Sequence, residues 1–191
     1  MYTGDTTTGL IALGANLPSG DIPPEDSVPL AMDRLEAICG PGAVRSRLFS
    51  TPAFPAGSGP DFVNAAMRVM WRRSAEALLQ ALHGIEEEFG RTRANRWEAR
   101  VMDLDLIGFG DAVLPSPEVR AEWAALSPEE AAKVVPDQLI LPHPRLADRG
   151  FVLVPLADVA PDWVDPSTGL SVRAMLDALD PEELETICPL G

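Results

Sequence analysis

The sequence predicts a single α+β domain. Short apolar runs typical of strands and longer segments with helical spacing occur in mixed order along the chain, and no internal repeat is visible. The chain has 191 residues, 46% of them hydrophobic, which is enough to bury one core. We therefore expect residues 1–191 to fold as one domain.

The first half of the chain reads as a strand, a helix and two more strands. Leu10–Leu13 is an apolar run that ends in a tight turn, and residues 29–38 repeat apolar side chains at helical spacing. Residues 39–42, Cys-Gly-Pro-Gly, cannot continue that helix. Residues 44–51 and 62–70 then read as strands that could pair antiparallel across a loop rich in proline and glycine.

The next part of the chain predicts a helix followed by a strand. Ser74 is placed to cap the helix and Gly90 to end it. The apolar stripe between them consists of Leu78, Leu82, Ile85 and Phe89. Residues 103–109 then begin with the period-two alternation of a strand.

The last third of the chain predicts mostly short elements. A capping box, Ser127-Pro-Glu-Glu130, predicts a short helix over 128–134. We expect Phe151–Pro155 to form a further apolar strand, and residues 172–179 a helix. A second capping pattern, Asp180-Pro-Glu-Glu183, predicts a final helical turn.

Positive charge is concentrated in ten residues of a strongly acidic chain. The net charge is −14, yet residues 91–100 hold four arginines against one glutamate. These are Arg91, Arg93, Arg96, Glu98 and Arg100. General nucleic-acid and anionic-membrane binders display a broad basic face, so the composition argues against both classes. A small polyanion remains possible, because guanidinium groups bind phosphate oxygens through a planar fork of donors.

Two aspartates follow this cluster closely. Because side chains alternate along a strand, Asp103 and Asp105 share one face while Leu104 and Leu106 turn toward the core. An Asp-x-Asp pair is common on the solvated face of a sheet. Taken alone, the pair is therefore better explained as part of such a face than as a metal site. Beside the arginines, a Mg²⁺ site explains the two like charges better, since a divalent cation neutralises them. The combination predicts a phosphoryl-transfer site.

Other motifs narrow the possibilities without deciding the function. The chain has neither a P-loop nor a G-x-G-x-x-G fingerprint, so side chains must hold the phosphates. His143 lies in a proline-rich turn, where a histidine is more often structural than catalytic. The segment from Thr51 to Asn64 offers a hydroxyl, an amide and the aromatic rings of Phe54 and Phe62. That set suits a flat heterocycle but equally suits an ordinary core edge.

The sequence contains few features that indicate a cellular compartment or a redox role for its cysteines. Cys39 and Cys188 lie far apart with no metal-binding or disulfide pattern. The N-terminus lacks a basic region, and no run of about 18 apolar residues occurs. We expect a cytoplasmic protein.

Several motifs, taken in order, resemble the 6-hydroxymethyl-7,8-dihydropterin pyrophosphokinase family of folate biosynthesis. They are Leu13–Leu17, Ser50–Pro52, Asp61–Ala66, Arg96–Arg100, Asp103–Leu106, Leu141–Pro144 and Arg149–Phe151. The set spans residues 10–165 approximately, and R-W-x-x-R-x-x-D-L-D-L is highly specific. The resemblance implies a ferredoxin-like α+β sandwich, an antiparallel sheet with helices packed on it. It also implies transfer of pyrophosphate from ATP to the pterin hydroxymethyl group, with release of AMP.

The resemblance also implies roles for individual residues. The implied catalytic residues are Arg91, Arg100, Asp103 and Asp105, and the two aspartates hold two Mg²⁺ ions. The ATP-binding set is Glu86, Arg93, Trp97, Arg100, His143 and Arg149. The pterin-binding set is Thr51, Pro52, Phe54, Phe62, Asn64 and Phe151. The implied partners are ATP and a reduced pterin, with no nucleic acid or membrane, and the implied state is a monomer.

Three departures from the family pattern bear on this expectation. The turn at residues 14–17 reads Gly-Ala-Asn-Leu in place of Gly-Ser-Asn-Leu, and Glu98-Ala99 replaces a common Gly-Pro. An insertion at about residues 111–138 affects the adenine-side positions Gln138 and Ile140. Two alternatives stay open: a noncatalytic pterin- or nucleotide-binding protein on the same fold, and a metal-dependent phosphoryl transferase with another acceptor.

Overall fold

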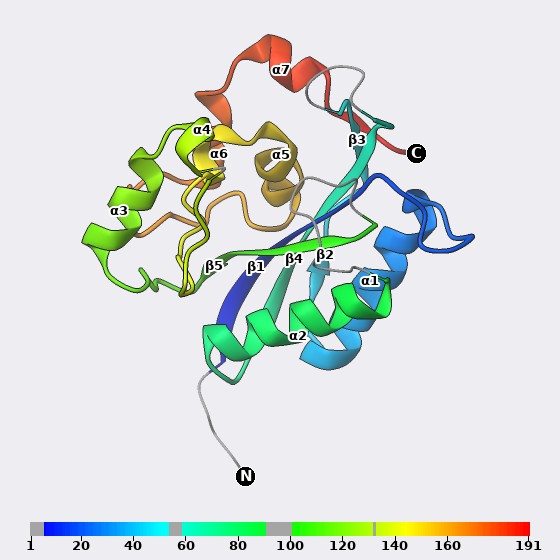
Figure 1. The fold of residues 1–191 in the computed structure, drawn as a ribbon, viewed down its shortest axis with the longest axis horizontal. Coiled ribbons are helices and arrows are strands. Elements are labelled where there is room, and N and C mark those ends of the chain that lie inside the picture. The colour runs from blue at the N-terminus through cyan, green and yellow to red at the C-terminus, as the bar shows by residue number, and fades with distance from the viewer. Residues whose placement is uncertain (1–5, 54–58, 91–100, 132) are drawn as a thin grey trace.

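The chain folds around one antiparallel sheet, as the computed structural model shows for residues 6–53, 59–90, 101–131 and 133–191 (Figure 1). The strand order is β5-β1-β4-β3-β6, with β2 also paired to β4. The strands are β1 (Thr7–Ala15), β2 (Val44–Arg45), β3 (Phe49–Thr51), β4 (Phe62–Trp71), β5 (Asp103–Phe109) and β6 (Cys188–Pro189). The prediction of an α+β fold is therefore confirmed.

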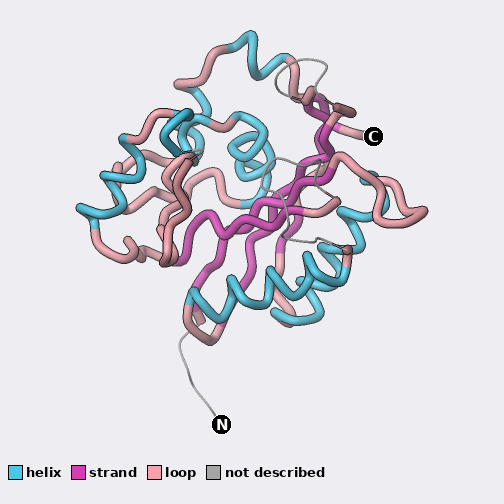
Figure 2. The backbone as a smooth tube through the Cα atoms, viewed as in Figure 1, coloured by secondary structure: helices cyan, strands magenta, loops and turns pink. Residues whose placement is uncertain are grey.

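Helices cover both faces of the sheet (Figures 1 and 2). The α-helices are α1 (Pro24–Cys39), α2 (Ala75–Glu88), α3 (Pro117–Ala125), α4 (Pro128–Ala131), α5 (Gly150–Val159), α6 (Val172–Asp177) and α7 (Pro181–Glu185), and a 3₁₀ turn, η1, spans Leu146–Asp148. One core cluster joins α1 and α2 to the sheet, and a second joins α5 and α6 to the opposite face. The fold is thus a sandwich of three layers.

β1 lies between β5 and β4 in the sheet and contributes to both cores. Ile11 and Leu13 belong to the α1 and α2 side, whereas Leu10 and Ala12 belong to the α5 side. Because both faces are covered, the strand reads as a continuous apolar run rather than an alternating one.

The helix caps that the sequence predicts are confirmed. The Ser74 side chain accepts a hydrogen bond from the Ala77 backbone N–H at the start of α2. Ser127 and Glu130 form the reciprocal bonds of a capping box, although α4 ends at Ala131 rather than at residue 134.

The prediction for residues 151–155 is wrong, because this segment lies in helix α5 and not in a strand. A short apolar run bounded by breakers cannot be assigned from periodicity alone. Beyond the run, Leu156 and Val159 continue the buried face of α5 that Val152 and Leu153 begin, at helical spacing. Burial on one side against β4 therefore decides in favour of a helix.

The single strand expected over residues 44–51 is divided into β2 and β3. Both pair antiparallel with β4, as expected, but the register shifts by one residue between Arg45 and Phe49. Ser46 lies at the break, where its hydroxyl accepts a hydrogen bond from the Ala66 backbone N–H at 2.8 Å. The shift places Thr51 directly opposite Phe62.

Across the four described ranges, no helix combines the length and the apolar character that a bilayer crossing requires.

Candidate active site

A row of paired residues crosses the sheet and defines the floor of the site. Gly14 of β1 pairs with Asp103 of β5 on one side and with Asn64 of β4 on the other. Directly paired residues in antiparallel strands point to the same face. In the same alternation, Ala12 and Ala66 contact the core under α5, so the row faces the α5 side.

Gly14 puts no side chain at the middle position of this row. A Cβ atom added there would lie 3.0 Å from Oδ1 of Asn64, closer than an ordinary carbon–oxygen contact. The glycine therefore lets the Asn64 amide lie against β1, one strand away from the carboxylate of Asp103 on β5.

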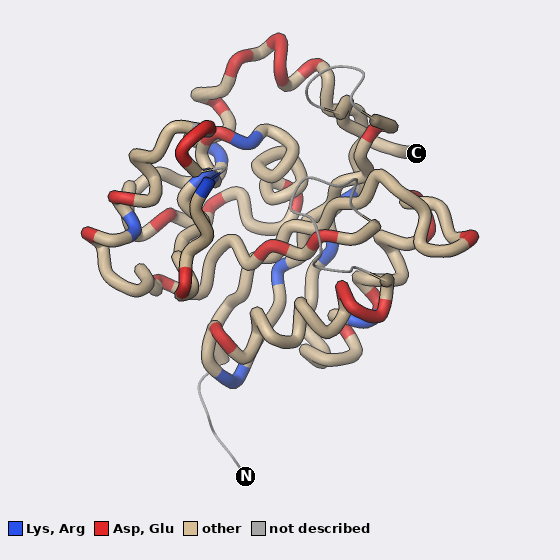
Figure 3. The backbone as a smooth tube through the Cα atoms, in the orientation of Figure 1, with Lys and Arg blue, Asp and Glu red and all other residues tan. Residues whose placement is uncertain are grey.

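The two aspartates share a face, as the strand period predicts. Leu104 and Leu106 are buried in the core on the α2 side, whereas Asp103 and Asp105 are half-buried on the α5 side. The Asp105 carboxylate forms an ion pair with the Arg149 guanidinium, with 3.6 Å between Oδ2 and Nη1. β5 is the edge strand, so these carboxylates sit at the border of the sheet (Figure 3, red positions on β5).

Glu86 supports β5 from helix α2. Its side chain is only 2% exposed, and its Oε1 accepts a hydrogen bond of 2.9 Å from the Leu104 backbone N–H. This bond holds the edge strand between the two aspartates. A contact between Glu86 and the nucleotide stays a prediction.

Arg149 connects the aspartates to the start of α5. It is the N-cap residue of that helix, and its guanidinium carbon lies 5.7 Å from the centroid of the Phe151 ring. Burial lowers the pKa of the Arg149 guanidinium from its ordinary value, while the charge of Asp105 opposes that shift. Because arginine remains protonated in proteins, this site keeps one positive charge directed at Asp105.

His143 lies in the turn that precedes η1. Its backbone N–H donates to the Ile107 carbonyl of β5 at 2.8 Å, and its Nδ1 accepts from the Arg145 backbone N–H at 3.1 Å. Burial lowers the imidazole pKa to about 4, with neighbouring arginines adding to the shift and Asp105 opposing it. At neutral pH the ring is uncharged, and the accepting Nδ1 leaves the proton on Nε2 as a donor.

A cavity of about 480 Å³ is lined by Asp105, His143 and Arg149, but not by Asp103, Asn64 or Glu86. Its ionisable lining consists of Asp105 of β5, of His143, Arg145 and Arg149 in the turn before α5, and of Asp137 in the segment before that turn. Most of its apolar lining comes from α2, α3 and the segment before His143, with Leu106 added by β5; it includes Leu79, Trp123, Val134, Leu139 and Ile140. A pocket of this size and mixed character suits an organic phosphate ester.

None of the predicted pterin residues that the structure describes lines this cavity; they lie on or next to β3, on β4 and in the first turn of α5. Asn64 is 5% exposed, and its Nδ2 donates to Oγ1 of the buried Thr51 at 2.7 Å. Phe62 lies two residues before Asn64 on β4, on the same face, and Pro52 is exposed after Thr51. The Phe151 side chain is 39% exposed in the first turn of α5.

Several predicted residues fall outside the part of the chain that the structure describes. These are Phe54, Arg91, Arg93, Trp97 and Arg100, together with Glu98-Ala99.

Two residues that line the cavity, Arg145 and Trp123, carry no role in the sequence prediction. Arg145 follows His143 closely in the sequence, and this proximity is a signal that could have found it. Trp123 has no such signal, because its position depends on how the insertion folds.

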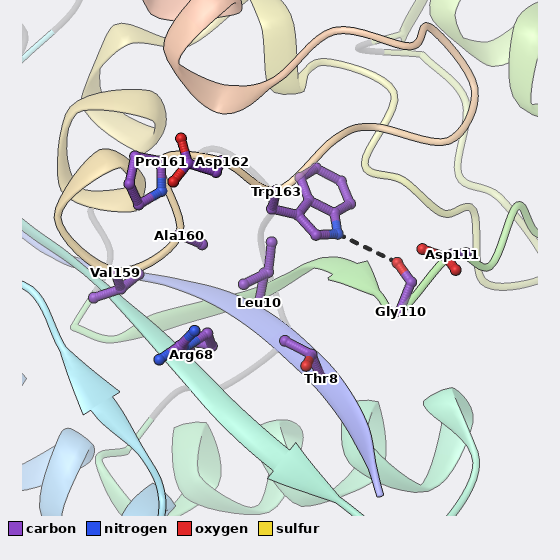
Figure 4. A pocket seen from close by; sticks show the side chains of 10 residues that line it. All are labelled: Thr8, Leu10, Arg68, Gly110, Asp111, Val159, Ala160, Pro161, Asp162 and Trp163. Carbon is purple, nitrogen blue, oxygen red and sulfur yellow. Dashed lines mark hydrogen bonds between the residues drawn. The ribbon is translucent and has the colours of Figure 1, made fainter.

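A second cavity of about 310 Å³ lies at the opposite end of α5, between its last residues and the sheet (Figure 4). Trp163 forms one wall and donates from Nε1 to the Gly110 carbonyl at 3.3 Å. Among the predicted site residues that the structure describes, none lines this cavity. The first cavity is therefore the candidate active site.

Comparison with known proteins gives the same answer as the motifs. The model of the family described as 7,8-dihydro-6-hydroxymethylpterin-pyrophosphokinase (HPPK) matches residues 10–161. A 2-amino-4-hydroxy-6-hydroxymethyldihydropteridine pyrophosphokinase from Synechocystis sp. is 37% identical over 145 residues, 76% of this chain and 61% of the relative. The protein of the same name from Pseudomonas aeruginosa is 34% identical over 179 residues, 93% of this chain and 94% of the relative.

Solved structures confirm the ferredoxin-like fold. Wild-type Plasmodium falciparum HPPK-DHPS with STZ-DHP superposes with a TM-score of 0.62 at 12% identity, over 93% of this chain and 44% of that one. The same protein with pteroate gives a TM-score of 0.60 at 12% identity, over 91% and 44%. This chain thus spans under half of those chains and 61% of the Synechocystis relative. By its motifs, its fold and a family match across most of its length, the chain belongs to the HPPK family.

Proposed function

We propose that this chain catalyses Mg²⁺-dependent transfer of pyrophosphate from ATP to the hydroxymethyl group of 6-hydroxymethyl-7,8-dihydropterin, giving AMP and the pterin diphosphate. The observation that carries the proposal is the row Asp103–Gly14–Asn64. It sets a carboxylate suited to a metal next to an amide suited to a heterocycle. The site therefore offers neighbouring places for the two substrates of one transfer reaction.

The carboxylates fit Mg²⁺ bound together with phosphates. Within the described ranges, no group of three or more His, Cys, Asp or Glu side chains could hold a metal ion. Two carboxylates alone match the usual Mg²⁺ arrangement, in which one or two protein carboxylates share the ion with substrate phosphates and water. Asp103 and Asp105 would hold two such ions, which when bound supply positive charge to the phosphate oxygens.

The basic lining residues orient the triphosphate. Arg149 places positive charge beside Asp105, Arg145 adds a second guanidinium to the cavity lining, and neutral His143 offers an Nε2–H donor. In the reaction the pterin hydroxyl oxygen bonds to the β-phosphorus, the bond from that phosphorus to the α–β bridging oxygen breaks, and the hydroxyl proton is released. Arg91 and Arg100 remain our candidates for stabilising the transferred group, and Arg93 and Trp97 for closing over ATP.

The pterin is proposed to bind against β3 and β4. The Asn64 amide, fixed by its bond to Thr51, reads the donor and acceptor edge of the ring. Phe62 and Phe151 would stack on its two faces, and Pro52 and Phe54 would border it. We also propose that the chain acts as a monomeric, single-domain protein of the cytoplasm.

One assay tests the reaction directly. The protein is incubated with ATP, Mg²⁺ and the reduced pterin alcohol, and nucleotides are separated by chromatography. AMP that forms only when the pterin is present supports the proposal. Release of ADP would overturn the pyrophosphoryl assignment, binding without AMP would indicate a noncatalytic protein, and AMP formed only with another acceptor would indicate a different transferase.

A substitution tests the role of the aspartates. Asp105→Ala should abolish nearly all AMP formation while the fold is retained, whereas Asp111→Ala, an exposed acid two residues beyond β5, should leave the rate unchanged. If Asp105→Ala kept the wild-type rate at saturating Mg²⁺, the metal role would be wrong.

A further inference from the structure

We propose that the insertion at residues 111–138 supplies the wall of the cavity that holds the nucleotide base, with Trp123 as the residue that contacts it. The inference rests on the proposed function, because it takes ATP as the ligand of this cavity.

The insertion reaches the cavity with apolar side chains. Trp123 of α3 and Val134, just after α4, both line it. Val134 is 42% exposed, which is high for an aliphatic side chain that borders a cavity. A flat apolar ligand would cover both side chains.

The two kinds of lining indicate which part of a nucleotide lies where. The two cationic lining residues, Arg145 and Arg149, both lie in the turn before α5, beside Asp105 of β5, where a triphosphate and its metal ions are expected. The insertion adds one charged lining residue, Asp137, whose carboxylate would repel phosphate. Most of the apolar side chains come from α2, from the insertion and from the residues that follow it. A base carries no charge and has two apolar faces, so it belongs against the second set.

Helix α3 is held firmly in this position. Arg120 and Trp123 lie three residues apart and so share one side of the helix. Arg120 donates from Nε to the Pro142 carbonyl and from Nη2 to the Asp165 carboxylate, each at 3.3 Å. The side chains of this ion pair are only 9% and 1% exposed.

A second anchor lies just before α3. Leu114 and Leu141 form an isolated antiparallel bridge, with backbone hydrogen bonds of 2.8 and 3.1 Å. Both anchors end within two residues of His143, which also lines the cavity. The insertion thus fixes the distance between an aromatic wall and a phosphate-binding turn, which favours a ligand of defined length.

The test separates contact with the base from contact with the phosphates. Wild type, Trp123→Ala and Trp123→Phe are titrated in the calorimeter with an α,β-methylene analogue of ATP and, separately, with inorganic triphosphate, both with Mg²⁺. Trp123→Ala should weaken binding of the ATP analogue about 10-fold, as expected for one lost aromatic–base contact, and should leave triphosphate binding unchanged. Trp123→Phe should retain most of the affinity.

Matched controls guard against unfolding. Glu122→Ala changes an exposed neighbour on the same helix that does not line the cavity, and it should bind like wild type. Unchanged binding of the pterin alcohol by Trp123→Ala, together with the unchanged triphosphate affinity, would show that the rest of the site is intact.

The outcomes distinguish this inference from the proposed reaction. Equal affinity of Trp123→Ala and wild type for the ATP analogue overturns the inference even if wild type forms AMP. Equal losses for the analogue and for triphosphate overturn it too. Selective loss for the analogue supports the inference even if no AMP forms, and absence of nucleotide binding by wild type overturns both.

Discussion

Gly14 offers a sharp test of how the floor of the site is built. In Gly14→Ala the new methyl group would lie 3.0 Å from Oδ1 of Asn64, so one of the two must move by a few tenths of an ångström. β1 is paired on both sides and has little freedom to move. The amide of Asn64 must therefore give way, although its hydrogen bond of 2.7 Å to Thr51 opposes that movement.

The expected magnitude follows from that one bond. A weakened buried hydrogen bond costs about 1 kcal/mol, which corresponds to a fall of roughly 2–4 °C in the unfolding temperature of a chain of this size. If the same amide recognises the pterin, the dissociation constant for the pterin alcohol should rise about 5-fold, because 1.4 kcal/mol is tenfold.

Thermal unfolding and equilibrium titration with the pterin alcohol measure the two effects. Gly84→Ala is the matched control, since Gly84 lies exposed in α2 with no atom within 4 Å of the added Cβ. That change should raise stability by about 1 kcal/mol through helix propensity alone and leave pterin binding unchanged. Wild-type stability and wild-type pterin affinity in Gly14→Ala would refute the reasoning.

Three further predictions concern the supports of the site. Glu86→Leu should lower the free energy of unfolding by about 2 kcal/mol, because it leaves the Leu104 N–H without its acceptor. Glu86→Gln should lose less stability. Chemical denaturation would measure both variants, and equal losses would contradict the role of the hydrogen bond. The pKa of His143 is lowered to about 4 from 6.5, so its contribution to stability is present above pH 6.5 and lost as the pH falls toward 4. His143→Gln should therefore show a smaller loss of stability than wild type over that interval in denaturation at stepped pH, and parallel curves would contradict this. Arg120→Met should lower the free energy of unfolding by about 3 kcal/mol, because it leaves the buried Asp165 carboxylate without its cationic partner. Adding Asp165→Asn to that variant should recover part of the loss. If the stability losses of the two single variants simply add in the double variant, the two residues are not coupled.

The local geometry of the site could be predicted wherever one element alone decides it. The strand period suffices to put Asp103 and Asp105 on one face, and the caps at Ser74 and Ser127 follow from side-chain chemistry within a few residues. These features depend only on residues that are close in the sequence, so the sequence alone is enough to predict them.

Features set by long-range pairing could not be predicted in this way. The approach of Asn64 to Asp103 depends on β1 lying between β4 and β5 and on a register that the motif itself does not encode. The position of Trp123 depends on an ion pair between residues 45 positions apart. The segment after Arg149 was misassigned because burial against β4, rather than its own pattern, decides its state.

The hydrogen bonds along β5 have a consequence for behaviour at high concentration. An outermost strand with unused backbone groups invites a strand from another molecule to join it, which is a common route to aggregation. Here the Glu86 carboxylate occupies the Leu104 N–H, and the N–H of His143 occupies the Ile107 carbonyl. Edge-to-edge stacking of copies through this border is thereby discouraged, and the border that carries the acidic pair stays accessible to small solutes.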